Sequence, residues 1–307
     1  MSWGLADAVR RHAVALNLVQ SPNERSSHVV PTPSGGGVGI AVAGSLAGIL
    51  VCVGAPAYFW WVLAASVLIA CVGLVDDRFD LSSRIRIVIH FLVVGGLLFA
   101  LPALPSIATP LGGLPAPLLY AMALVAGVWW VNLFNFMDGI DGIAASQAVF
   151  MAVGLVALIV TASGTIQANP AVFWLVFTAS ASAGFLVLNW PPAKVFMGDV
   201  GSNYLAVIIL ALGLHEIATG RLSYAAFLIL VAAFSTDATI TLVRRAAMGE
   251  RWFAAHRLHA YQKLSRRRGH GPVTLLYLAI NLLWLYPLAY MATIFPQNSL
   301  LAGGAAY

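Results

Sequence analysis

The sequence predicts an all-α, polytopic integral membrane protein with about nine transmembrane helices. Of its 307 residues, 61% are hydrophobic and only 9% are charged, whereas an ordinary soluble domain carries about 25% charged residues. Apolar runs recur at close to the ~20 residues that a helix needs to cross the core of a bilayer. The nine runs are 36–54, 56–74, 85–102, 115–134, 143–162, 170–188, 202–218, 223–243 and 273–294. Short loops join them, so residues 1–307 are predicted to form one membrane-embedded domain.

The first 35 residues are expected to form a cytoplasmic N-terminal segment. Residues 1–20 are polar and amphipathic, and Arg10, Arg11 and His12 stand where a cleavable signal sequence would need an apolar core. We therefore expect a helix on the cytoplasmic membrane surface and no cleaved signal.

The basic residues orient the chain in the membrane. If the N-terminal segment lies on side one, fifteen of the sixteen Lys and Arg residues fall on that side, and only Arg221 falls on the other. An excess of Lys and Arg marks the cytoplasmic loops, so side one is the cytoplasm, and residues 244–272 form its most basic loop. The net charge of +5 is thus a topology signal, with no nucleic-acid partner expected. The run Arg266 to Arg268 is interpreted as lying against anionic lipid headgroups.

The loop after the second run carries adjacent carboxylates, Asp76 and Asp77, at the membrane edge. A charge there is costly unless it is partnered or hydrated. Mg²⁺ takes oxygen ligands and usually keeps phosphate oxygens in its shell, so this pair suits a divalent cation or a charged substrate. A solvated helix end with Arg78 and Arg84 as counter-ions is the equally weighted alternative.

The loop after the fourth run concentrates amides, carboxylates and glycines. Its residues of interest are Asn132, Asn135, Asp138, Gly139, Asp141 and Gly142. The two Asn are three residues apart and share a helix face, and the glycines allow a backbone that approaches a ligand closely. A plain Asn/Asp/Gly turn is the alternative, but it does not require so many of these residues within eleven positions.

The loop after the sixth run, from Asn189 to Ser202, brings Lys194 and Asp199 to the start of a helix. Backbone N–H groups and the positive end of that helix favour an anion, and Lys194 can act as a point charge for phosphate. In the alternative interpretation, Asp199 or Ser202 only caps the helix.

The loop after the eighth run contains His256 and His259, with Arg257 and Lys263 interleaved. The neighbouring cations would repel zinc, and no Cys or third His stands at ligand spacing, so phosphate binding is favoured over a metal site. An exposed amphipathic helix is the alternative. Asp237 lies within the eighth run, where an acid is a functional candidate by default, although pairing with Arg244 or Arg245 would explain it structurally.

Together these loops suit phosphoryl transfer, which needs oxygen ligands for a metal and cations around a diphosphate. One substrate would be a soluble activated diphosphate and the other a membrane-borne acceptor. A transporter is the competing class, and an inactive scaffold is a third. Against a transporter, the polar residues crowd one interface, and the loops at 103–114 and 163–169 carry no charge.

The sequence resembles the polyprenyl-phosphate N-acetylhexosamine-1-phosphate transferases of glycosyltransferase family 4, and most closely the bacterial O-antigen-initiating branch. Five motifs carry the resemblance in the family's order: residues 25–37, 76–77, 132–143, 194–199 and 256–262. The resemblance implies transfer of an N-acetylaminosugar 1-phosphate from a UDP-sugar to undecaprenyl phosphate with release of UMP. This would be the initiating step of O-antigen or cell-envelope polysaccharide synthesis, at the cytoplasmic face of the bacterial inner membrane.

The resemblance also implies roles for residues. Mg²⁺, or Mn²⁺ in its place, would be held by Asn135 and Asp199. The residues implied in catalysis are Asp76, Asp77, Asp138, Asp141, His256 and His259. Those implied in substrate binding are Asn132, Asn189, Lys194, Arg257 and His28.

Two features depart from the family pattern. Ser34 stands where the family usually has a basic residue, so an anion contact expected from that loop must come from elsewhere. The family normally adds one spanning helix before the Arg25 loop and one after the ninth run, so eleven spans are the expected full set. The sugar and the oligomeric state are not fixed by the sequence, which is compatible with a homodimer.

Overall fold

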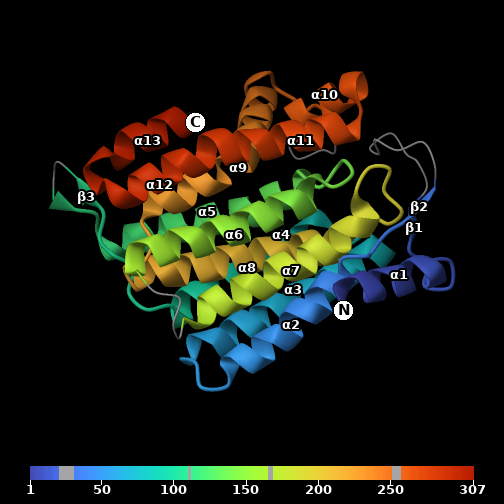
Figure 1. The fold of residues 1–307 in the computed structure, drawn as a ribbon, viewed down its shortest axis with the longest axis horizontal. Helices are drawn as coiled ribbons and strands as arrows, with labels where there is room; N and C mark the ends of the chain where they lie inside the picture. Colours follow the sequence, from blue (N-terminus) through green and yellow to red (C-terminus); the bar gives the residue numbers. More distant parts are fainter. Residues whose placement is uncertain (21–30, 110–111, 165–168, 251–256) are drawn as a thin grey trace.

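The computed structural model describes residues 1–20, 31–109, 112–164, 169–250 and 257–307, which form a bundle of long helices (Figure 1). The predicted residues His28 and His256 lie outside these ranges. The helices are α1 (Ser2–His12), α2 (Val38–Cys52), α3 (Tyr58–Phe79), α4 (Ser83–Ala100), α5 (Ala116–Phe136), α6 (Ile143–Ser163), α7 (Pro170–Asn189), α8 (Gly198–Ala218), α9 (Tyr224–Ala247), α10 (Ala260–Arg268), α11 (His270–Ile280), α12 (Tyr286–Ile294) and α13 (Ser299–Ala306).

Strands are confined to two small antiparallel pairs in the described chain. β1 (Val19–Gln20) pairs with β2 (Thr32–Pro33), and β3 (Ala108–Thr109) pairs with β4 (Gly112–Gly113). A π-helical turn, Asn281–Leu285, joins α11 to α12, and a 3₁₀ turn, Pro296–Asn298, precedes α13. The all-α class is confirmed.

Eight helices among the described residues are long and apolar enough to cross a membrane. They match the second to ninth predicted runs, and α11, the π turn and α12 together form the last of them, His270–Ile294. The first run forms α2, which has only 15 residues and is about 22 Å long at 1.5 Å per residue. The protein is therefore a multi-pass membrane protein.

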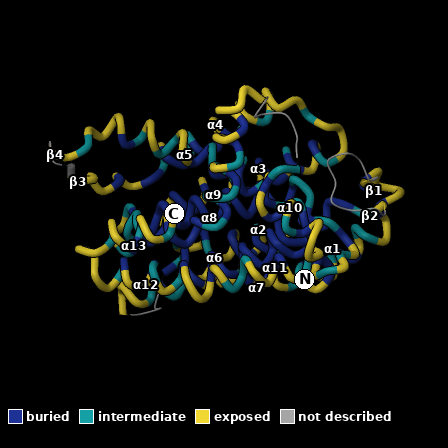
Figure 2. The backbone as a smooth tube through the Cα atoms, turned by 90° about the horizontal axis from the view of Figure 1, so that it is seen from above, coloured by how far each residue is buried: buried dark blue, intermediate teal, exposed yellow. Residues whose placement is uncertain are grey.

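Helix α8 is the centre of the bundle, because each of its residues from Val200 to Ile217 is buried. A helix that is apolar all around can only be satisfied by packing on every side. Figure 2 shows α8 in the middle of the molecule, whereas α12 and α13 lie at its rim.

Glycines let neighbouring backbones approach the start of α8. A Cβ on Gly37 would lie 2.4 Å from Cα of Gly201, and a Cβ on Gly73 would lie 2.5 Å from the carbonyl oxygen of Asp199. Small residues at helix contacts allow the close packing on which membrane bundles depend. The start of α8 is thus fixed against both α2 and α3.

The N-terminal helix α1 packs one face into the bundle. Ser2, Ala6 and Asp7 are buried, and a Cβ on Gly39 of α2 would lie 2.4 Å from the carbonyl oxygen of Ser2. Asp7 forms ion pairs with Arg10 (2.7 Å) and Arg11 (2.6 Å). Residues 1–20 thus contain a short helix, as expected, but one with a buried side.

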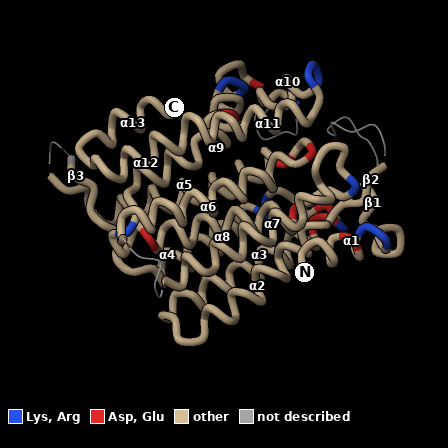
Figure 3. The backbone as a smooth tube through the Cα atoms, in the orientation of Figure 1, with Lys and Arg blue, Asp and Glu red and all other residues tan. Residues whose placement is uncertain are grey.

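Charged residues gather mainly at the end of the bundle that carries α10, β1 and β2 (Figure 3). The C-terminal end of α8 holds the exception. Glu216 is fully buried and accepts hydrogen bonds from Nε and Nη2 of Arg221 at 2.7 and 3.1 Å and from Nδ2 of Asn169 at 3.0 Å. Nδ1 of His215 lies 3.0 Å from Oε1 of Glu216. The one basic residue on the far side of the predicted topology is therefore paired with a buried carboxylate.

This pairing predicts an order of stability between two variants. Arg221→Ala leaves a buried carboxylate without its cation, and such a loss typically lowers the free energy of unfolding by about 3–5 kcal/mol. Because Arg221 is one-third exposed, we expect a smaller loss, on the order of 2 kcal/mol. Glu216→Gln removes the charge itself and should cost less. Thermal unfolding in detergent tests the order, and two variants as stable as the wild type would contradict it.

Candidate active site

The last turn of α3 caps the start of α8. Asp76 and Asp77, expected in a loop, lie within this helix. Oδ1 of Asp77 accepts a hydrogen bond from the N–H of Asp199 at 2.8 Å, and Oδ2 accepts one from the N–H of Val200 at 3.2 Å. These N–H groups have no partner inside their own helix, and residue Met197 before them supplies no side-chain cap. Gly198 has φ of +74°, and a Cβ there would lie 2.5 Å from Oδ2 of Asp77, so only glycine fits. The alternative in which Asp199 or Ser202 caps this helix is wrong.

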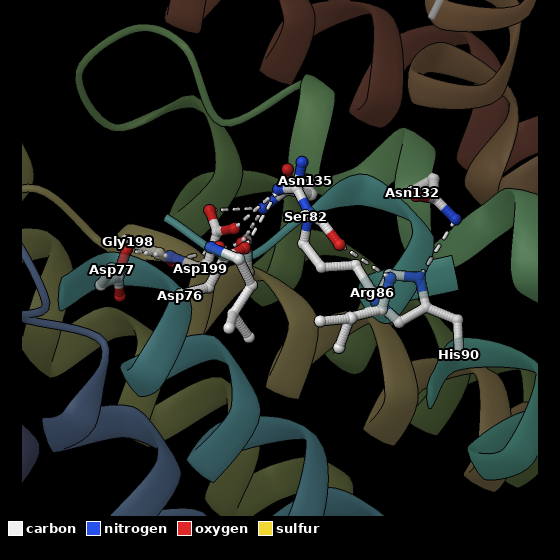
Figure 4. A network of polar contacts seen from close by, with 12 residues as sticks. Asp76, Asp77, Ser82, Arg86, His90, Asn132, Asn135, Gly198 and Asp199 are labelled. Carbon is white, nitrogen blue, oxygen red and sulfur yellow. Dashed lines mark hydrogen bonds and ion pairs between the residues drawn. The ribbon is translucent and has the colours of Figure 1, made fainter. Parts of the chain in front are cut away.

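Asp199 is the point where three helices meet (Figure 4). Its Oδ1 accepts a hydrogen bond from Nδ2 of Asn135 at 2.8 Å, and its Oδ2 lies 3.4 Å from Nη1 of Arg86. The Asn135 amide also donates to Oγ of Ser202 at 3.0 Å. The two residues predicted as metal ligands, Asn135 and Asp199, are therefore brought into direct contact.

Arg86 of α4 bridges two carboxylates. Its Nη1 donates to Oδ2 of Asp76 at 3.0 Å as well as facing Asp199. The other oxygen of Asp76 accepts a hydrogen bond from the N–H of Leu81 at 2.7 Å. The expected counter-ions were Arg78 and Arg84, and this is corrected, because Arg86 reaches back from the first turns of α4 while the Arg78 guanidinium lies over the ring of Phe79 at 5.3 Å.

Asp141 and Asn189 join the second and third loops. Oδ2 of Asp141 accepts a hydrogen bond from the N–H of Ala193 at 3.0 Å and lies 3.2 Å from Nδ1 of His270. Oδ1 of Asn189 accepts one from the N–H of Gly142 at 3.0 Å, and its Nδ2 donates to the carbonyl of Val195 at 2.9 Å. Both side chains thus hold the site's loops together. The catalytic role implied for Asp141 and the substrate contact implied for Asn189 stay predictions.

Asp138 faces the acidic cluster from the loop after α5. Burial is the main cause that raises its pKa, and the negative charges of Asp199, Asp77 and Asp141 raise it further. Like charges in one buried cluster are relieved by protonation of one carboxyl or by a nearby cation. Arg86 supplies one positive charge, beside Asp76 and Asp199.

The donor set at this point fits a hard divalent cation. It offers the carboxylates of Asp76 and Asp199 and the amide of Asn135, all of them oxygen donors. In the described part of the chain no three His, Cys, Asp or Glu side chains are arranged as a complete ligand set. Mg²⁺ commonly takes only one or two protein carboxylates and fills its shell with water and substrate phosphate, so this arrangement suits it better than zinc.

A groove of about 370 Å³ runs from the acidic cluster along α4 and α5. Its polar end is formed by Arg86, Asn135 and Asp199. Its walls are mainly apolar, and the side chains that form them are Ile87, Phe91, Val125, Val128, Trp129 and Phe136. The groove therefore has a charged end and mainly apolar walls.

Asn132 lies along this groove rather than beside Asp199. Its Nδ2 donates to the carbonyl of Val128 at 2.8 Å and lies 3.1 Å from Nδ1 of His90, one turn beyond Arg86 on α4. Asn132 and Asn135 thus share a face, as expected, but contact different partners.

The fourth loop reaches the site through His259 and Tyr261. The His259 ring is buried and stacks near Phe136 and Tyr261, with centroids 6.4 and 5.9 Å away. Burial lowers the pKa of His259, and the nearby charge of Asp237 partly opposes this. Asp237 accepts hydrogen bonds from the start of α10, and the ion pair of Arg245 is with Glu250 at 3.3 Å, so the expected pairing of Asp237 with Arg244 or Arg245 is corrected.

Lys194 and Arg257, two further predicted substrate contacts, belong to the third and fourth loops. Lys194 is exposed on its loop, and its N–H donates to the carbonyl of Leu188 at 2.8 Å. The carbonyl of Arg257 accepts a hydrogen bond from Arg266 at 3.1 Å. Their contacts with substrate stay a prediction.

Sequence reasoning missed Arg86, His90 and His270 as site residues. Arg86 had been counted only toward topology. Its spacing of four from His90 indicates that both lie on one face of α4, but this spacing does not identify the partners of Arg86, which lie 10 and 113 residues away.

Comparison with known proteins places this geometry in a family. Residues 59–217 match the family model for glycosyl transferase family 4. A decaprenyl-phosphate N-acetylglucosaminephosphotransferase of Mycobacterium tuberculosis strain H37Rv is 30% identical, over 83% of this chain and 71% of that protein.

Further relatives carry similar names. A probable undecaprenyl-phosphate N-acetylglucosaminyl 1-phosphate transferase of Bacillus subtilis strain 168 is 29% identical, over 83% of this chain and 72% of its own length. The undecaprenyl-phosphate alpha-N-acetylglucosaminyl 1-phosphate transferase of Escherichia coli K12 is 30% identical, over 84% and 71%. The matched region contains Asp76, Asn135 and Asp199, and the chain belongs to glycosyl transferase family 4, with polyprenyl-phosphate N-acetylglucosamine phosphotransferases among its relatives.

Proposed function

We propose that this protein transfers an N-acetylaminosugar 1-phosphate from a UDP-sugar to a polyprenyl phosphate, undecaprenyl phosphate in the first instance, and releases UMP. The observation that carries the proposal is the groove whose polar end is the Arg86–Asp76–Asp199 cluster and whose walls are apolar. A lipid phosphate needs this combination of a cation at one end and apolar surface along the chain. The names of the relatives support the same chemistry.

In this proposal the acceptor phosphate lies near Arg86, and its lipid tail follows α4 and α5 toward the bilayer. A phosphate monoester has its second pKa near ~6, so the acceptor oxygen is mostly ionised at neutral pH. Attack can then be direct: an acceptor oxygen bonds to the β-phosphorus of the UDP-sugar while the bond from that phosphorus to the bridging oxygen breaks. UMP leaves with the bridging oxygen, and no covalent aspartyl intermediate is needed.

Asn135 and Asp199 would hold the Mg²⁺, with Asp76 beside them. The ion would supply positive charge to the diphosphate oxygens as negative charge is redistributed. Asp77 orients Asp199 by fixing the start of α8, and Arg86 offers a second positive charge on the acceptor side.

The UDP-sugar would occupy the cytoplasmic side of the cluster, bounded by the loops that contain Asp138, Asp141, Lys194, Arg257 and His259. The fifteen-to-one distribution of basic residues supports a cytoplasmic orientation. In a bacterium we expect the enzyme in the inner membrane. The reaction would begin O-antigen or another cell-envelope polysaccharide.

The function is tested with purified protein, Mg²⁺, polyprenyl phosphates of ten and eleven isoprene units, and a panel of UDP-N-acetyl sugars. We expect UMP release with at least one donor and only when an acceptor is present. Donor alone should leave no phosphate on the enzyme. If no UMP is released with any donor, the proposed function is wrong. If a phosphorylated enzyme forms with donor alone, the direct attack is wrong.

Replacing Asp199 by Asn should abolish turnover. The amide preserves the shape of the side chain but removes the negative charge that holds the cation, so we expect a loss of about 10³-fold or more. Glu250→Gln is the matched control, because it removes an exposed acid from the same side and should leave turnover within a factor of two. Both are measured as UMP release under saturating Mg²⁺, and near-normal activity of Asp199→Asn would refute the metal role.

Filling the groove should weaken acceptor binding only. Val125 lines the groove from α5 and is 61% exposed, so Val125→Trp can occupy the groove without disturbing the core. We expect the KM for polyprenyl phosphate to rise about tenfold while the donor KM stays constant. Val176→Trp on α7, at a similarly exposed position outside the groove, should change neither. If Val125→Trp instead raises only the donor KM, the groove does not bind the acceptor and its assignment is wrong.

A further inference from the structure

Asp237 is a buried acid on α9 that the proposed mechanism does not use. Its side chain is 5% exposed, in a segment long and apolar enough to cross the membrane. An acid in such a place is costly unless it is well partnered. Its partners therefore show what the residue does.

The partners of Asp237 belong to the start of α10 and to α11. Oδ1 accepts a hydrogen bond from the N–H of Ala260 at 2.8 Å, and Oδ2 accepts one from the N–H of Tyr261 at 3.0 Å. The hydroxyl of Tyr277 on α11 also donates to Oδ2, at 2.5 Å. Helix α10 has no side-chain cap of its own, since His259 at its N-cap position makes no such bond. Asp237 supplies that cap from another helix, where a negative charge is also favoured by the helix dipole.

The capped helix start is in turn fastened to the acidic loop. The hydroxyl of Tyr261 donates to the carbonyl of Phe136, the last residue of α5, at 2.8 Å. A Cβ on Gly139 would lie 2.2 Å from that hydroxyl and 3.1 Å from Nε2 of Gln262. The loop that carries Asp138 therefore runs directly against the first turn of α10.

His259 is held by the same contacts. Its Nδ1 lies 3.9 Å from Oδ1 of Asp237, and its ring lies between those of Phe136 and Tyr261. Figure 1 shows α9, α10 and α11 meeting at the polar end of the bundle. Asp237 thus contacts the start of α10, and the start of α10 in turn contacts His259 and the loop of Asp138.

We infer that Asp237 is a positioning residue: by capping α10 from within α9, it holds His259 and the Asp138 loop in register on the side of the site where the diphosphate donor binds. The inference rests on the proposed function for its kinetic consequence. The acceptor groove runs along α4 and α5, and Phe136, which stacks near His259, forms part of its wall. The capped start of α10 contacts the groove at Phe136, whereas it contacts the Asp138 loop at both Phe136 and Gly139. Loss of Asp237 should therefore affect the donor more than the acceptor.

The kinetic test compares Asp237→Ala, Asp237→Asn and Glu216→Gln. Losing the cap in Asp237→Ala should raise the donor KM about tenfold and should raise the acceptor KM clearly less. Asp237→Asn keeps one carbonyl oxygen as acceptor and should recover part of this loss. Glu216→Gln changes a buried acid at the far end of α8 and should leave both KM values unchanged. A fall in kcat with both KM values constant in Asp237→Ala would show a merely structural role and overturn the inference.

A double-mutant cycle with His259→Ala tests whether Asp237 acts through the start of α10. If it does, Asp237→Ala should cost clearly less in the His259→Ala background than in the wild type, because residues in one network are not additive. Full additivity would overturn the path through His259.

Hydrogen exchange separates failure of this inference from failure of the proposed function. Amides at 260–264 should exchange faster in Asp237→Ala than in the wild type or Glu216→Gln, whether or not the wild type is active. A wild type that releases no UMP from any donor would sink the proposed function alone. Unchanged exchange at 260–264 would sink the capping role.

Discussion

The carboxylate of Asp77 on the first N–H groups of α8 is the interaction on which the rest of the site depends. Helix α8 is buried from Val200 to Ile217 and half-buried at Gly198 and Asp199, and the N–H groups at its start have no partner within the helix. Asp77 provides it from α3, and the glycines Gly73 and Gly198 make room for the approach. Once the start of α8 is fixed, Asp199 points at Asn135 and Arg86, and the amide, the guanidinium and Asp76 fall into place around it. The adjacent carboxylates at the end of α3 thus have different contacts: Asp77 caps α8, and Asp76 pairs with Arg86 beside Asp199.

The distribution of charge over the two ends of the bundle follows from the same constraint: a buried charged or polar group needs a partner. At the polar end, several acids lie close together, and Arg86 forms ion pairs with two of them, Asp76 and Asp199. At the other end, roughly 30 Å away along the 21 residues of α8, one carboxylate and one guanidinium neutralise each other. Asp237 solves the problem of a buried acid in a third way, by capping a helix. None of these acids is left to the lipid, and each one ties helices together.

The fold followed from hydropathy because the bilayer imposes a length on each apolar run. The same argument failed where the boundary depends on a distant residue: the seventh run was expected to begin at 202, but α8 begins at Gly198 because Asp77 caps it from another helix. Asn135 and Asp199 were predicted together and do lie together, since both end or begin a helix on the same side. The role of Arg86 could not be read from local sequence, because its partners, Asp76 and Asp199, lie 10 and 113 residues away. The same holds for Asp237, whose expected partners Arg244 and Arg245 were close in sequence while its actual partners lie in α10 and α11.

The central claim is that a sugar phosphate, rather than a sugar alone, moves to the lipid at the Asp76–Arg86–Asp199 cluster. A donor labelled with ³²P at the β-phosphate tests this directly in membranes that contain the purified protein and polyprenyl phosphate. The account predicts that the label passes to the lipid fraction while unlabelled UMP is released in equal amount, and that Asp199→Asn stops both. Label that stays in the water phase as UDP while the sugar reaches the lipid would contradict it.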